Sequence, residues 1–192
     1  VLQADGSPDV PGAVTSLAEF ARRLATVPLE AEPGAHWRYS YGLDLIGRIV
    51  EIVSGQSFNA FLKQTFFDPL GMTSTGFRVP AQDHVRLVDN FAPDYAAGGG
   101  KTILVDPGAT SKFLQKPTYL SGGGGLVSSA RDYDRFLAML MGGGIFQGTT
   151  VLPPHAVTLG MSNLLPAGTD MGGYFFAGSG DGFGAGGRVV QI

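Results

Sequence analysis

Cysteine is absent from the 192 residues. Its absence excludes disulfide bonds, a thiolate nucleophile and zinc–cysteine sites within this sequence. It fits both reducing and oxidising compartments, so the sequence leaves the compartment open, with the cytoplasm slightly favoured over the periplasm. Long apolar runs are missing as well, and no stretch has the length of a membrane-spanning helix.

Charged residues are also scarce, at 15% of the chain, and the net charge of -3 does not favour nucleic acid as a partner. The hydrophobic share of 44% is typical of a folded globular protein. His36, His84 and His155 lie far apart without carboxylates at ligand spacing, so we expect no metal site and no cofactor.

Glycine, in contrast, is abundant, with 30 residues. Clusters stand at 98–100, 122–125 and 142–144. Glycine permits positive φ and close backbone approach, and such clusters more often mark turns between packed elements than ligand cradles. The chain contains no phosphate-loop pattern, so nucleotide binding is not indicated.

Helical periodicity accounts for most of the remaining sequence. Ser16 and Glu19 form a capping-box pattern, which predicts that a helix begins at residue 17. Ser129 with Asp132 predicts a second such start, so Asp132 is interpreted as a helix-start residue. The predicted helices cover residues 17–26, 42–54, 58–67, 129–141 and 153–161.

The segment 42–54 has the widest apolar stripe of the chain. Seven aliphatic residues form it: Leu43, Leu45, Ile46, Ile49, Val50, Ile52 and Val53. A stripe of this width predicts a helix buried in the core. Asp44 lies on the other face, where we interpret it as a solvated charge or a structural partner.

Strands are expected mainly near the end of the chain, which predicts an α+β fold. Short strands are predicted at 86–91, 102–105, 174–177 and 183–192, and the weakly periodic stretch 73–125 is expected to include a lid or binding loop. We expect a helical region over 1–170 and the first strands of a sheet over 171–192. An unpaired strand edge would need covering, so missing segments of the same protein or a second chain are expected to complete the sheet.

Four stretches together resemble the serine beta-lactamase and penicillin-binding-protein-like superfamily, most closely the family VIII carboxylesterases. They are 32–51, with Pro-Gly-x-x-Trp-x-Tyr-Ser; 67–77, with Phe-Asp-Pro-Leu-Gly-Met; 122–133; and 182–186. The resemblance implies a partial beta-lactamase/transpeptidase-like fold. It also implies a serine hydrolase that acts on small ester or β-lactam substrates through an acyl-enzyme.

The nucleophile motif of that superfamily, Ser-x-x-Lys, is missing, because no serine stands three residues before any of the four lysines. The chain therefore resembles the middle of such an enzyme, and the chain alone is expected to be inactive. The resemblance assigns a catalytic role to Tyr39, whose hydroxyl would relay the proton of the attacking serine. A free phenol is a poor base at neutral pH and needs a neighbouring cation for this role.

Trp37 and Tyr41 flank Tyr39 and are candidates for the substrate pocket. Beta-lactamases usually carry asparagine at the position of Tyr41, so the resemblance favours esters over β-lactams. Two alternatives stay open: a ligand-binding protein without catalysis, and a true beta-lactamase. Residue patterns alone are equally consistent with Tyr39 as a packing aromatic beside Trp37.

Overall fold

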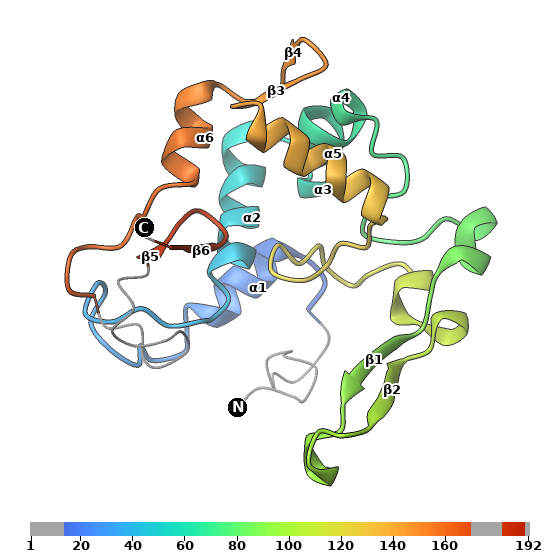
Figure 1. Ribbon diagram of the computed structural model, residues 1–192. Coiled ribbons are helices and arrows are strands. Elements are labelled where there is room, and N and C mark those ends of the chain that lie inside the picture. Colours follow the sequence, from blue (N-terminus) through green and yellow to red (C-terminus); the bar gives the residue numbers. More distant parts are fainter. Residues whose placement is uncertain (1–13, 170–181, 191–192) are drawn as a thin grey trace.

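The computed structural model describes residues 14–169 and 182–190, and it contains helices and small antiparallel sheets (Figure 1). This confirms the predicted α+β class. The α-helices are α1 (Leu17–Leu24), α2 (Gly42–Ser54), α3 (Phe58–Leu62), α4 (Asp68–Leu70), α5 (Ala130–Met141) and α6 (Pro154–Gly160). The strands are β1 (Asn90–Pro93), β2 (Thr102–Asp106), β3 (Ile145–Phe146), β4 (Thr149–Thr150), β5 (Gly182–Phe183) and β6 (Arg188–Val189). They pair as three hairpins, β1–β2, β3–β4 and β5–β6.

The predicted helix starts are confirmed by their side-chain caps. The hydroxyl of Ser16 accepts a hydrogen bond from the amide of Glu19 at 3.1 Å, and Ser129 accepts one from Asp132 at 3.2 Å. Gly55 ends α2 in the left-handed conformation, with φ of 69°. The segment predicted as one helix over 58–67 is instead α3 followed by a π-helical turn, Lys63–Phe67, which leads into α4.

A small hydrophobic core joins α4 to α5. Leu70 and Met139 are fully buried there, and Phe67 and Met72 complete the buried cluster. A second contact joins α1 to α2, where Leu17 and Phe58 lie against Gly47. These contacts hold α1 and α3 against α2, and Figure 1 shows the three helices as neighbours.

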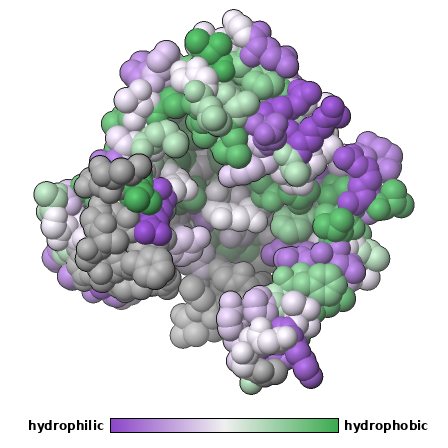
Figure 2. Space-filling view, viewed as in Figure 1, coloured by the Kyte–Doolittle hydropathy of each residue, from purple (hydrophilic) through white to green (hydrophobic). Residues whose placement is uncertain are grey.

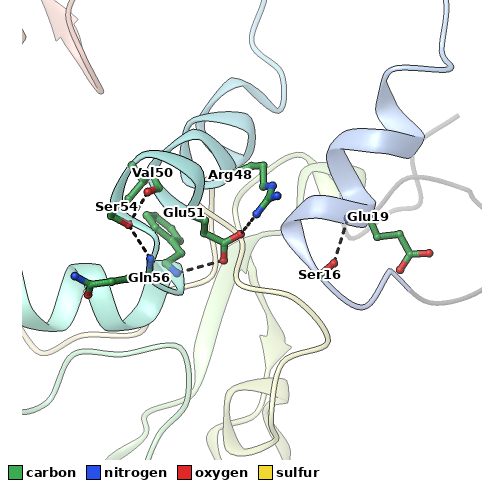
Figure 3. Close-up of polar contacts among 8 residues, drawn as sticks. Ser16, Glu19, Arg48, Val50, Glu51, Ser54 and Gln56 are labelled. Carbon is green, nitrogen blue, oxygen red and sulfur yellow. Dashed lines mark hydrogen bonds and ion pairs between the residues drawn. The ribbon is translucent and has the colours of Figure 1, made fainter.

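Polar contacts hold the C-terminal end of α2 against α3. The carboxylate of Glu51 pairs with Arg48 at 3.1 Å and accepts the amide of Phe58 at 3.2 Å. The hydroxyl of Ser54 donates to the carbonyl of Val50 and accepts from the amide of Gln56 (Figure 3). The polar face of α2 therefore contacts the rest of the described structure.

The prediction that the apolar stripe of α2 is buried is wrong for the described residues. Val53 is 81% exposed, and Ile46, Ile49 and Ile52 are each at least half exposed. The reason is that α1 and α3 pack on the side of α2 that carries Asp44, Gly47 and Glu51, which leaves the aliphatic side open. Figure 2 shows apolar side chains at the surface over several parts of one face.

Two of the predicted strands need correction, because residues 81–86 form a 3-10 helix and β1 begins only at Asn90. The single strand expected over 183–192 is instead part of the β5–β6 hairpin, which turns at 184–187 where three of four residues are glycine. The strand expected at 102–105 is confirmed as β2. The strand expected at 174–177, and most of the region expected over 171–192, lie outside the described residues.

The β1–β2 hairpin projects away from the helices in Figure 1. It belongs to the stretch predicted to hold a lid or binding loop, and that role stays a prediction. None of the helices within residues 14–169 and 182–190 combines the length and the hydropathy of a membrane-spanning segment.

Candidate functional site

Tyr39 lies in the loop that leads into α2. This loop follows the turn at Pro33-Gly34, where the amide of Ala35 donates to the carbonyl of Glu32 and Gly34 adopts a φ of 87°. The side chain of Tyr39 is 67% exposed. The sequence thus places a phenol at the surface, three residues before the first turn of a helix whose other end is held by hydrogen bonds.

Trp37 connects this loop to the C-terminal hairpin. Its ring centroid lies 6.3 Å from that of Tyr39 and 5.1 Å from that of Phe183 in β5. Trp37 and Phe183 are both half-buried. The fold therefore brings an aromatic residue from the end of the chain beside the Tyr39 loop, a contact that sequence spacing did not reveal.

Tyr41, the second pocket candidate, faces α1. Its ring meets Phe20 edge-on at 5.4 Å, and Tyr119 stacks on the same Phe20 ring at 5.4 Å. Phe20 itself is almost completely buried. Phe20 thus anchors two segments on α1, the start of α2 through Tyr41 and the segment around Tyr119. The part of Tyr41 in a substrate pocket stays a prediction.

The segment after Tyr119 packs directly on the first turn of α2. A Cβ atom on Gly122 would lie 2.3 Å from the carbonyl oxygen of Leu43, and one on Gly123 would lie 3.0 Å from Oδ2 of Asp44. Only glycine permits this approach. From the sequence this cluster was expected to be a turn, and its contact with α2 was not predicted. The run of four glycines was the available signal, because glycine permits close backbone packing.

Of the two interpretations of Asp44, the solvated charge is wrong, and the structural partner stays a prediction. It is the third residue of α2, and only 3% of its surface is exposed. The buried oxygen Oδ1 has no hydrogen-bond partner among the described residues. A carboxylate is therefore buried at the base of the loop that carries Tyr39.

Asp132 does more than start a helix. Its carboxylate accepts hydrogen bonds from the amide of Ser74 at 2.7 Å and the hydroxyl of Thr75 at 2.8 Å. Gly76 and Val127 exchange backbone hydrogen bonds beside this contact, at 3.0 and 2.9 Å. These bonds connect the loop after α4 to the segment that lies between residues 122–125, the glycine loop, and α5.

The described residues contain no group of three or more His, Cys, Asp or Glu side chains that could hold a metal ion. His36 and His155 are exposed, and His84 lies within hydrogen-bond distance of the carbonyl of Val79, at 3.2 Å. The ring of Tyr39 contacts the indole of Trp37.

Comparison with known proteins identifies the family and the fold. The family model described as Beta-lactamase matches residues 2–191. Protein Rv1367c of Mycobacterium tuberculosis is 35% identical over 136 residues, which are 71% of this chain and 33% of that protein. Esterase EstB of Burkholderia gladioli is 35% identical over 133 residues, which are 63% of this chain and 33% of EstB. The chain thus spans about one-third of the length of these curated relatives.

Among solved structures, one similar chain is EstCE1, described as a hydrolase with promiscuous acyltransferase activity. The match has a TM-score of 0.66 at 24% identity and covers 100% of this chain and 52% of that chain. At this identity the likeness shows the fold alone. It confirms the expected beta-lactamase/transpeptidase-like fold, of which this chain contains a part.

Proposed function

Because the chain belongs to the beta-lactamase family, we propose that the complete protein is a serine hydrolase, a carboxylesterase that forms an acyl-enzyme. The observation that supports this proposal best is the placement of Tyr39, exposed at the start of α2 beside Trp37. The name of EstB, an esterase 35% identical to this chain, supports the same class of substrate. In this proposal the serine and its lysine lie in parts of the complete protein that this chain lacks.

In each half of the proposed reaction, acylation and deacylation, Tyr39 takes part in two proton transfers. As the serine hydroxyl attacks the ester carbonyl, the phenolate oxygen of Tyr39 takes the hydroxyl proton. When the carbon–oxygen bond of the leaving group breaks, the phenol returns that proton to the departing alkoxide. Water then repeats the sequence and releases the acid, with serine as the leaving group. Trp37 and Phe183 would offer an aromatic wall for the substrate.

Esters are preferred over β-lactams in this proposal because of Tyr41. The ring at this position packs against Phe20, so no side-chain amide is available there to bind a lactam substrate. A ligand-binding protein without catalysis is the second candidate. It is favoured by the missing Ser-x-x-Lys motif, since none of the four lysines of this chain follows a serine at that spacing.

The test uses the complete gene product. A fluorophosphonate probe followed by intact mass measurement detects a reactive serine, and a missing adduct would favour the ligand-binding protein. Rates with a nitrophenyl ester and with a chromogenic cephalosporin then separate an esterase from a beta-lactamase.

Tyr39→Phe removes the phenolic hydroxyl and keeps the ring. We expect kcat for the ester to fall by about 10²- to 10⁴-fold, the usual range for loss of a general acid–base group, with nearly unchanged stability. Tyr95→Phe is the matched control, because Tyr95 is exposed on a separate 3-10 turn. Equal turnover by the two variants would mean that Tyr39 only packs beside Trp37 and takes no part in catalysis.

A further inference from the structure

Asp44 presents an energetic problem within the described residues. Its carboxylate is removed from solvent, and Oδ1 has no hydrogen-bond partner there. Burial of an ionised carboxylate is unfavourable when one of its oxygens receives no hydrogen bond. The positive end of the α2 dipole favours a carboxylate near the first turn, but within the described residues it supplies no hydrogen bond to Oδ1. A further donor would remove this unfavourable contribution.

The immediate surroundings of Asp44 leave little room for a displaced side chain. Gly123 covers Oδ2, and Gly122 lies against the backbone of Leu43 and Asp44. The amide of Asp44 donates to the carbonyl of Tyr41 at 3.1 Å, which fixes the backbone. The carboxylate is thus held at a defined place, five residues after Tyr39 and beneath the glycine loop.

We propose that Asp44 is a positioning residue whose Oδ1 accepts a hydrogen bond from a side-chain donor, a hydroxyl or a cationic N–H, in the part of the complete protein that this chain lacks. The curated relatives are about three times as long as the matched segment, so most of the chain that could carry the donor lies outside these residues. The bond would fix the start of α2 and the glycine loop relative to that part. Its effect on catalysis rests on the proposed function, whereas the bond itself does not.

A crystal structure of the complete gene product tests the bond directly. A hydroxyl or N–H side chain within hydrogen-bond distance of Oδ1 supports the proposal. A water molecule alone, or no partner, overturns it.

Melting temperatures test the bond independently of any activity. If a donor pairs with Asp44, Asp44→Ala leaves that donor buried and unpaired, and the melting temperature should fall by roughly 5 °C or more. If the carboxylate is unpaired, its removal relieves the desolvation cost and the melting temperature should rise. The control is Asp134→Asn, an exposed carboxylate on α5. An Asp44→Ala value equal to or above that of the control overturns the proposal.

Ester turnover tests the positioning role. We expect Asp44→Ala to lower kcat at least tenfold while KM stays within about twofold. The side chain of Asp44→Asn can still accept a hydrogen bond. If the donor is a hydroxyl, Asp44→Asn should therefore retain more activity than Asp44→Ala. If the donor is cationic, the two variants should have the same low activity. A lower melting temperature with unchanged kcat would mean a purely structural carboxylate and overturn the positioning role. If the wild-type protein hydrolyses no ester, the proposed function fails, and the crystal structure and melting temperatures still decide whether the bond exists.

Discussion

Gly122 offers the sharpest test of the contact between the glycine loop and the first turn of α2, the helix that follows Tyr39. In Gly122→Ala the new methyl group would lie 2.3 Å from the carbonyl oxygen of Leu43 and 3.0 Å from its carbonyl carbon. Ordinary contact begins at 3.4 Å, so the loop and the first turn of α2 must separate by roughly 1 Å. Both sides of the contact are backbone, and neither can rotate away.

Overpacking of this kind costs about 1–3 kcal/mol in the free energy of unfolding. The same displacement acts on the start of α2, three residues after Tyr39. A misplacement of about 1 Å can lower an enzymatic rate by about 10²-fold, so we expect kcat/KM for the ester to fall by up to that factor.

Gly124→Ala is the matched control, because a Cβ at Gly124 would have no atom within 4 Å and the φ of this residue is not positive. Here we expect unchanged stability or a gain of about 0.4–1 kcal/mol from lower entropy of the unfolded chain. Urea unfolding of both variants of the complete gene product, with ester kinetics on the same samples, makes the comparison. Unfolding free energies of the two variants within 0.5 kcal/mol of each other would refute the argued contact.

Two further predictions concern stability. Leu70→Ala should lower the free energy of unfolding by about 2–5 kcal/mol, because Leu70 is 0% exposed in the core that joins α4 to α5. Met141→Ala is the control, because Met141 is 89% exposed, and it should change this free energy by less than about 0.5 kcal/mol. Equal losses in the two variants would contradict the described core. Hydrogen bonds from the hydroxyl and amide of Thr15, and then from Arg23, lower the pKa of Glu19 to about 2 from 4.5. The folded pKa is depressed, so this stabilisation is complete above about pH 4.5 and is lost as the pH falls through about 2. Glu19→Gln should therefore be less stable than wild type at pH 6, and urea unfolding should show the difference shrinking toward pH 2; a constant difference would contradict it.

Local rules were enough for the starts of α1 and α5 and for the end of α2. The caps of α1 and α5 each join residues three positions apart, so Ser16 and Ser129 could be identified without knowing the fold. The end of α2 followed in the same way from Gly55, which adopts the left-handed conformation. One detail differed, since the carboxylate of Glu19 reaches the amide of Thr15, one residue before the expected cap.

Contacts between distant segments could not be derived in this way. The carboxylate of Asp132 accepts from Ser74 and Thr75, more than fifty residues earlier, and Trp37 meets Phe183 near the end of the chain. Periodicity gives the two faces of a helix, but not which face a neighbour covers.

The sequence by itself therefore determined where α1 and α5 begin, where α2 ends, the α+β class and the loop that carries Tyr39. Only the tertiary structure decided that the polar side of α2 packs inward, that Asp44 is buried and that Gly122 touches the first turn of the helix. The physical reason is range: caps and turns are satisfied within a few residues, whereas burial depends on which segments, distant in sequence, pack against one another.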